Sequence, residues 1–434
     1  MSSVRLCLGT DVYKRQVLAA LLLVFTMRSQ IDILSMAAVC FLVYTMYCIP
    51  GIGISGCYRP KLSGTLYYIV YTQILIILLY MVCIRRRDKI RQAKAAALPS
   101  LTAAPQGEGS EQRLDMAFAI YTAIMVGFVL WNIAIIGIGG FLSGKANVWD
   151  RVNIFYIIAL YGSFPSFAYG MHRRKTLIWL PSLIIEASIF IAGARAFTAT
   201  LIVIFLCECG MLLWKNRRKN MKLYILGGTA VIFLLIYRKI DTYIMIGDIS
   251  GAIRILRNPL IWAQALEFNE PRVIIANYDY VLTQRFRLPP GDVIYRLVDF
   301  IPGAVSALPI KLTYPEYFSA WLQAEVQGSA GVGGTIWGES YAMFGIWGIF
   351  IFTLLWLSFV HFCNRHLKYE RAHSCFWVAL GTYLAWYINR LDFNRVGQVC
   401  KIHLLCYLLW GVIYISLGGE MTLFNRFKIY LHNR

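Results

Sequence analysis

The sequence TLYYIVYTQILIILLYMVCI occupies residues 65–84, and RRRDKIR follows it directly at residues 85–91. A run of 20 residues that are almost all apolar has the length of a helix that crosses the hydrocarbon core of a bilayer. The basic residues after it are typical of the cytoplasmic end of such a helix, because Lys and Arg accumulate in short cytoplasmic loops. This stretch therefore predicts a membrane-spanning helix and its direction.

The composition of the whole chain also favours a membrane protein. Of its 434 residues, 59% are hydrophobic and 15% are charged, and the formal net charge is +20. Soluble proteins carry about 25% charged residues. The basic residues form short clusters between apolar runs, which argues against nucleic acid as a partner. Most of the 11 cysteines lie inside apolar runs and no CxxC motif occurs, so they indicate neither a zinc site nor a redox site.

Similar apolar runs along the chain predict an all-α polytopic membrane protein with about 11 transmembrane helices. The predicted spans are residues 16–27, 32–50, 65–84, 115–139, 153–171, 176–193, 196–214, 223–237, 337–360, 375–389 and 402–418. The basic clusters after spans three, five, seven, nine and eleven all fall on one side of the membrane. We therefore expect a multi-pass protein whose C-terminus is cytoplasmic.

These spans divide the chain into a membrane domain in two parts and one long insertion. Residues 16–237 hold spans one to eight, with a polar cytoplasmic linker at residues 85–114, and residues 337–434 hold spans nine to eleven and a cytoplasmic tail. Residues 1–15 do not continue into the first apolar run and resemble translated adapter sequence. We exclude them from the fold prediction and expect the native start, with one more span, to be missing.

The insertion, residues 238–336, is predicted to be one long extracytoplasmic loop. It has nine basic and nine acidic residues, so its formal charge is zero. Short apolar-periodic stretches at residues 259–268 and 314–326 predict helices that lie on the membrane surface. Because long loops are usually functional, we expect the function to be on the extracytoplasmic face.

The candidate ligand-binding residues are arginines on that face. Arg195 lies in a short turn between two spans, where a guanidinium can bind an anion through two parallel hydrogen bonds or simply extend to the membrane surface. Arg285 and Arg287 flank Phe286 ahead of two prolines, so an extended chain would place both guanidinium groups on one face. Two such groups fit a diphosphate, although a solvated surface pair has the same pattern. Arg296 follows in the same loop.

A further arginine, Arg390, lies in the last predicted outer loop, residues 390–401. Asp392 and Arg395 are close to it in the sequence. These three side chains either pair with one another or complete a site for an anionic ligand.

Two carboxylates in predicted spans are candidates for a general base. Glu339 follows the Gly-rich stretch at residues 328–338 and enters the membrane at its outer edge, and Glu186 lies in the middle of a span. Ionisable groups in spans are costly and therefore functional candidates, although either carboxyl can serve only to pack helices. The loop at residues 238–336 has no histidine and the chain has no DxD motif, so we expect chemistry without a metal or a cofactor.

Some of these residues resemble a known family. The sequences GARAF, residues 193–197, and GGTIWGESYAMFGIWG, residues 333–348, together with one long outer loop ahead of the last spans, are similar to the O-antigen polymerases, also called Wzy-type oligosaccharide repeat-unit polymerases. The resemblance covers most of the chain from about residue 30. That family has more spans, with both termini inside, and the departure fits a lost first helix.

The resemblance implies a metal-independent glycosyltransferase of the bacterial inner membrane that uses no cofactor. Such enzymes move a polyprenyl-diphosphate-linked glycan onto the non-reducing end of another lipid-linked repeat unit and so build lipopolysaccharide, capsule or exopolysaccharide. Outer-loop arginines serve the family, and Arg195, Arg285 and Arg287 are the matching positions; guanidinium groups stabilise the charge of a leaving diphosphate. The implied partners are these lipid-linked oligosaccharides, the membrane, a chain-length regulator and a flippase.

Three other functions stay open. An O-antigen ligase has a similar layout but uses a histidine in its large outer loop, and this loop has none. A transporter or flippase of lipid-linked oligosaccharides usually has duplicated halves and broken helices, and the sequence has no duplication. A purely structural membrane protein would leave Arg195 and the Gly-rich stretch without a role.

Overall fold

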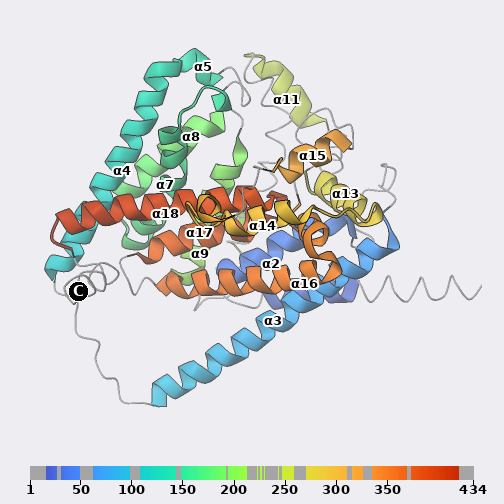
Figure 1. Ribbon diagram of the computed structural model, residues 1–434. Coiled ribbons are helices and arrows are strands. Elements are labelled where there is room, and N and C mark those ends of the chain that lie inside the picture. Colours follow the sequence, from blue (N-terminus) through green and yellow to red (C-terminus); the bar gives the residue numbers. More distant parts are fainter. Residues whose placement is uncertain are drawn as a thin grey trace, which may run out of the picture. The chain divides into compact units, whose positions relative to one another are not determined.

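The computed structural model describes residues 16–26, 31–48, 62–97, 108–142, 148–191, 194–212, 247–258, 270–309, 315–325, 335–368 and 373–419, together with residues 222, 225, 226, 229 and 243 (Figure 1). The chain divides into two compact units. Unit 1 takes residues 1–89, 209–365 and 381–400, and unit 2 takes residues 90–208, 366–380 and 401–434.

Regular structure in the described residues is helical, and no strand occurs among them. Five helices in this part of the chain are long and apolar enough to cross a membrane: Gly64–Ile90, Glu111–Ile136, Ile154–Arg173, Ile336–Lys368 and Phe393–Ser416. Each overlaps a span predicted from the sequence, which confirms the all-α class and supports a membrane location. The span predicted at residues 223–237 lies almost entirely outside the described residues, so the total of about 11 spans stays a prediction.

Unit 1 contains most of the residues from the predicted outer loop. Its helices are α2 (Ile33–Tyr44), most of α3 (Gly64–Ala97), α11 (Ile249–Arg257), α13 (Glu270–Thr283), α14 (Pro290–Val298), α15 (Phe318–Glu325) and α16 (Ile336–Arg365), with the 3-10 turns η1 (Met46–Cys48), η2 (Val305–Ala307) and η4 (Ile388–Arg390). Helices α17 (Ser374–Tyr387) and α18 (Phe393–Ser416) contribute residues to both units.

Buried polar contacts join the helices of unit 1. The Gln73 side chain of α3 donates to Thr353 of α16 at 3.1 Å, and the Tyr278 hydroxyl of α13 donates to Gln73 at 3.4 Å. Because these polar groups are buried, each needs a partner from another helix. Helix α13 comes from the predicted outer loop, yet its tyrosine reaches a residue inside the apolar run of α3. This loop helix therefore packs among the spanning helices of unit 1.

Asp32 connects three helices at another place in unit 1. Its carboxylate accepts the backbone N–H of Ser35 at 2.9 Å and so caps the first turn of α2. The same carboxylate lies 2.5 Å from the Arg85 guanidinium of α3 and accepts from the Asn364 side chain of α16 at 3.0 Å. Asp32 is buried, so both partners compensate for its loss of hydration.

Unit 2 is a bundle of apolar helices. It consists of α4 (Glu108–Ile136), α5 (Ile138–Leu142), α7 (Ile154–Arg173), α8 (Thr176–Ile191), most of α9 (Arg195–Leu212) and the 3-10 turn η3 (His366–Lys368). The Phe118 ring of α4 stacks on Tyr169 of α7, with 4.0 Å between ring centroids. The Tyr169 hydroxyl donates to Asp115 at 2.6 Å, and Lys175 lies 2.8 Å from the same carboxylate. Stacking and charge together align α4 with α7.

Helix α3 is longer than its apolar run. It continues through the basic cluster to Ala97, so residues 85–97 of the predicted linker 85–114 are helical. Arg, Lys, Gln and Ala are strong helix formers, which explains why the helix does not end where the apolar residues do. Helix α4 begins at Glu108, and residues 98–107 lie outside the described residues.

The last long helix begins earlier than predicted. Helix α18 starts at Phe393, so most of the predicted outer loop at residues 390–401 is helical. The carboxylate of Asp392 accepts the Arg395 N–H at 3.0 Å and thereby caps this start. Of the two helices predicted on the membrane surface, α15 falls within residues 314–326, and residues 259–268 lie outside the described residues.

Candidate functional site

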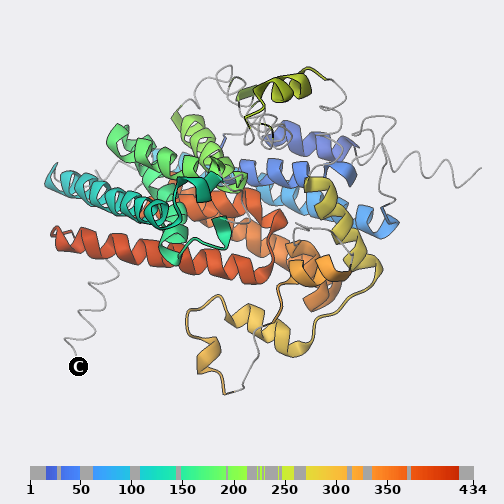
Figure 2. The ribbon, with the colours of Figure 1, turned by 90° about the horizontal axis from the view of Figure 1, so that it is seen from above.

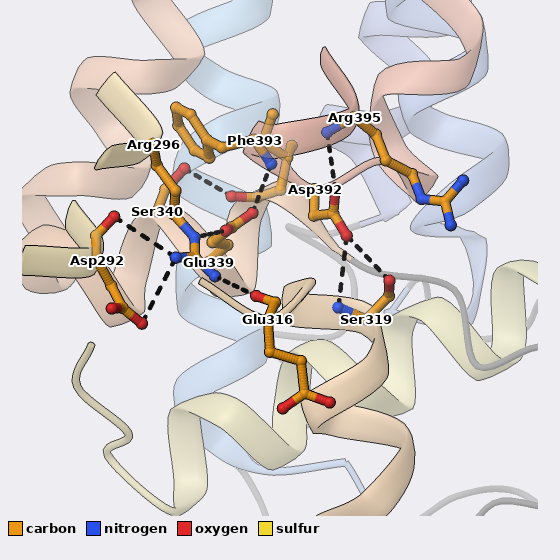
Figure 3. Close-up of polar contacts among 10 residues, drawn as sticks. Asp292, Arg296, Glu316, Ser319, Glu339, Ser340, Asp392, Phe393 and Arg395 are labelled. Atoms are coloured by element: carbon orange, nitrogen blue, oxygen red, sulfur yellow. Dashed lines mark hydrogen bonds and ion pairs between the residues drawn. The ribbon is translucent and has the colours of Figure 1, made fainter. Parts of the chain in front are cut away.

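Arg296 of α14 and Glu339 of α16 form a buried ion pair (Figure 3). The guanidinium Nε lies 2.5 Å from Glu339 Oε1, and the two side chains are 1% and 0% exposed. Arg296 also donates to the Glu316 carbonyl at 2.8 Å, and its Nη1 lies 3.6 Å from Asp292 Oδ2. Figure 3 shows the Glu316 carboxylate pointing away from this cluster. Arg296, which the sequence assigns to substrate binding, is therefore held by protein groups and closed off from solvent.

The second oxygen of Glu339 is also occupied. Glu339 Oε2 accepts the backbone N–H of Phe393, the first residue of α18, at 2.6 Å. The carboxylate thus connects the first turns of α16 and α18 to α14, and it balances the buried charge of Arg296. A substrate hydroxyl reaches Glu339 only if this arrangement opens, so the general-base role remains a prediction.

Asp392 and Arg395 do not pair through their side chains. Asp392 Oδ2 accepts the Ser319 hydroxyl of α15 at 2.9 Å (Figure 3), while the Arg395 guanidinium lies over the Tyr317 ring, 5.0 Å from its centroid. The Tyr317 hydroxyl accepts a hydrogen bond from Gln398 at 2.6 Å. These contacts attach the segment around α15 to the start of α18.

Arg390 pairs with Glu270 and not with Asp392, its acidic neighbour in the sequence. Its Nη1 lies 2.8 Å from Oε2 of Glu270, the first residue of α13, and its guanidinium lies 5.7 Å from the Tyr387 ring centroid. The charge of Arg390 is therefore neutralised within unit 1. It connects the first turn of α13 to the 3-10 turn η4 between α17 and α18.

Arg285 occupies the turn that ends α13. Its N–H donates to the Leu282 carbonyl at 3.2 Å, and the Phe286 N–H donates to the Val281 carbonyl at 3.3 Å. This is the hydrogen-bond pattern of a Schellman motif, in which glycine usually takes the left-handed position. Arg285 takes that position with φ of 50° and an exposed side chain. The extended conformation expected at this residue is therefore not adopted.

Arg287 lies against a break in α16. At Gly345 the helix is interrupted by φ of 69° and ψ of −157°, which leaves carbonyl groups before the break without helical partners. The Arg287 guanidinium donates to the Tyr341 carbonyl at 2.5 Å, and the Leu288 N–H donates to the Ala342 carbonyl at 3.0 Å. The guanidinium also lies over the Tyr341 ring, 4.4 Å from its centroid. The segment after Arg285 thus caps the first half of α16.

Arg285 and Arg287 differ from Arg296 and Arg390 in their charge balance. Both are exposed, and among the described residues neither forms an ion pair. Arg296 and Arg390 are each paired with a glutamate. A guanidinium has five N–H donors, so Arg287 keeps donors for a ligand after it has capped α16. The geometry therefore leaves positive charge available at the end of α13 and beside the α16 break.

Arg195 and Glu186 belong to unit 2. Arg195 is the first residue of α9 and is half-buried. Glu186 is buried in α8; its Oε1 accepts the Ser163 hydroxyl at 2.6 Å, and its Oε2 has no hydrogen-bond partner among the described residues. Whether Arg195 joins Arg285 and Arg287 in one site stays a prediction.

The sequence did not identify every residue that organises this region. Glu270 and Tyr341, which hold Arg390 and Arg287, were not assigned roles because their partners are far away in the sequence. For Asp32 the sequence contained a usable signal, since aspartate directly before an apolar helical run is a preferred N-cap residue. Within the described residues, no three His, Cys, Asp or Glu side chains are placed to hold a metal ion.

No protein-family model matches this chain, and no curated protein or solved structure is significantly similar to it. The described fold defines a helical membrane protein, and the polymerase family stays a prediction from the sequence.

Proposed function

We propose that this protein joins polyprenyl-diphosphate-linked oligosaccharide repeat units into a surface polysaccharide at the outer face of a bacterial inner membrane. The observation that carries the proposal is the pair Arg285 and Arg287: both are exposed, neither has an acidic partner among the described residues, and Arg287 lies on the broken helix α16. Cations near the end of a spanning helix suit a ligand whose diphosphate lies at the membrane surface and whose lipid lies in the bilayer.

The chemistry of the proposed reaction fits such cations. An acceptor hydroxyl of one repeat unit attacks the anomeric carbon of the donor glycan, the bond from that carbon to the lipid diphosphate breaks, and the hydroxyl proton passes to a base. The diphosphate leaves with increased negative charge, which guanidinium groups stabilise without a metal. Glu339 is the base that the sequence favours, with Glu186 second, and Glu339 acts so only when Arg296 releases it.

The test is polymerisation by the purified protein in vesicles that contain lipid-linked repeat units. We expect the double variant Arg285→Gln/Arg287→Gln to lose at least about 10²-fold in rate, because each charge-assisted hydrogen bond contributes about 1.5–3 kcal/mol. Arg254→Gln, at an exposed arginine of α11, is the matched control and should keep its rate. Thermal stability measured in parallel separates loss of function from loss of fold.

A ladder of normal length and rate in the double variant would falsify the proposal. The same assay tests Arg195, since Arg195→Ala should lose long-chain product while the protein still inserts in the membrane. A chain-length regulator and a flippase are the expected partners, and adding the regulator should change ladder length but not the arginine dependence.

The break at Gly345 favours a second candidate, a transporter or flippase for the same lipid-linked oligosaccharides. Transporters often bind substrates at discontinuous spanning helices. Vesicles with labelled lipid-linked repeat units distinguish the two functions. A flippase moves the label between leaflets and leaves its chain length unchanged, whereas a polymerase produces longer glycans.

A further inference from the structure

Helix α14 buries its one basic residue and exposes large apolar residues. Arg296 is buried, whereas Ile294, Leu297 and Ile301 are 41%, 47% and 64% exposed. Ile294 and Leu297 are three positions apart and lie on one face of α14, and Ile301 follows in the turn after the helix ends at Val298. We call these three side chains the apolar stripe. A helix whose outer face meets water carries polar residues there, and α14 has the opposite arrangement. Its outer face is therefore suited to apolar surroundings.

Two contacts fix the position of α14 relative to the spanning helices of unit 1. Arg296 binds Glu339, which lies in the first turn of α16. The Phe300 ring, just after α14, lies 6.2 Å from the ring of Phe393, the first residue of α18. Both helices are apolar enough to cross a membrane, and both contacts are at their ends. Helix α14 is thus held at the first turns of two helices that are apolar enough to cross a membrane.

We propose that α14 is an interfacial helix and that Ile294, Leu297 and Ile301 insert into the lipid at the membrane surface. Figure 2 shows the chain from α14 to η2, drawn in gold, at the edge of unit 1. Burial of this apolar stripe among acyl chains stabilises the helix in the interface. The buried Arg296–Glu339 pair then holds the lipid-facing helix against the spans. The proposal needs only a membrane location, and not the polymerase reaction.

The test is photo-crosslinking in the full-length protein. A benzophenone amino acid replaces Leu297 or Ile301, and the protein is reconstituted in vesicles of phosphatidylethanolamine and phosphatidylglycerol with an alkyne-tagged phospholipid. Tyr295, which is buried on the opposite face of α14, is the matched control. Trp347, exposed on the apolar part of α16, is the reference for a lipid-facing position.

We expect lipid adducts at positions 297 and 301 within about twofold of position 347, and about tenfold more than at position 295. Crosslinks from positions 297 and 301 to a second copy of the chain would show that these residues contact another protein chain and not lipid. That result would overturn the proposal. An absence of any product at both positions, with adducts at 347, would place the stripe in water and also overturn it. Equal lipid adducts at 295 would contradict the assignment of the two faces.

Discussion

Arg296 and Arg287 belong to the same loop but meet opposite surroundings. Arg296 is buried against Glu339, and its remaining donors are directed at Glu316 and Asp292. Arg287 is exposed and binds a backbone carbonyl at the α16 break. A neutralised guanidinium holds helices together, whereas one without a counterion keeps its charge for a ligand. The comparison therefore separates an arginine whose charge is neutralised inside the fold from one whose charge stays available for the proposed diphosphate.

The largest effect is expected on the buried side of this comparison. Glu339→Ala leaves the guanidinium of Arg296 buried without its counterion and leaves the Phe393 N–H without its acceptor. Breaking such a pair costs about 3–5 kcal/mol. We expect a large loss of thermal stability in detergent, with a matching loss of correctly inserted protein. Thermal unfolding of the purified variant, followed by intrinsic fluorescence, measures the change.

A charge-neutral double variant separates structure from chemistry at the same place. Arg296→Met/Glu339→Gln removes both charges, so most of the lost stability should return. If the double variant is stable and inactive while Arg296→Met alone keeps some activity, Glu339 acts in the reaction as the sequence predicts. If its activity returns together with stability, the carboxylate only holds α14. Wild-type stability in Glu339→Ala would mean that the pair does not support the fold.

The fold was predictable where the physical signal is local. A run of about 20 apolar residues is sufficient to identify a spanning helix, which is why all five long apolar helices among the described residues overlap predicted spans. The start of α18 was missed because the sequence FNRVGQ, residues 393–398, is polar and predicts a loop. Those residues are helical because Asp392 caps them and Glu339 accepts the Phe393 N–H, and Glu339 is distant in the sequence.

The candidate site was predictable only in its residue types. The sequence placed arginines and carboxylates in the outer region, but it could not tell which of them pair. Glu339 is 43 residues from Arg296, and the contact depends on how α14 packs on α16. The left-handed turn at Arg285 was also missed, because the usual glycine signal for a helix end is absent there.

A smaller effect is expected on the exposed side, at the break itself. Gly345→Ala places a side chain at φ of 69° and ψ of −157°, a region that is almost exclusive to glycine and costs other residues about 1–3 kcal/mol. The new Cβ would also lie 3.1 Å from Nη2 of Arg287, so the guanidinium should move. We expect slightly lower stability together with weaker binding of the lipid diphosphate, measured as a higher KM in the vesicle assay.

Gly127→Ala is the matched control for that variant. Gly127 lies inside α4, and a Cβ added there would meet nothing within 4 Å, so the substitution should leave stability unchanged or slightly raised. If Gly345→Ala behaves like Gly127→Ala in both stability and KM, the break in α16 does not position Arg287.

The smallest effect, and the one with opposite signs for stability and activity, is expected for Arg285→Gly. Relief of the left-handed conformation should gain about 1–2 kcal/mol, and the greater freedom of glycine in the unfolded chain should remove about 0.5–1 kcal/mol of that gain. We therefore expect a slightly more stable protein that polymerises more slowly, because it lacks a guanidinium.

The control variant Arg285→Ala keeps the cost of the left-handed backbone and loses the same charge, so it should be equally slow without the gain in stability. Thermal unfolding and initial rates, measured on both variants in the same vesicles, show whether the two properties separate. Arg285→Gly with wild-type rate would mean that this exposed arginine is not used, and the diphosphate would then depend on Arg287 and on residues beyond this turn.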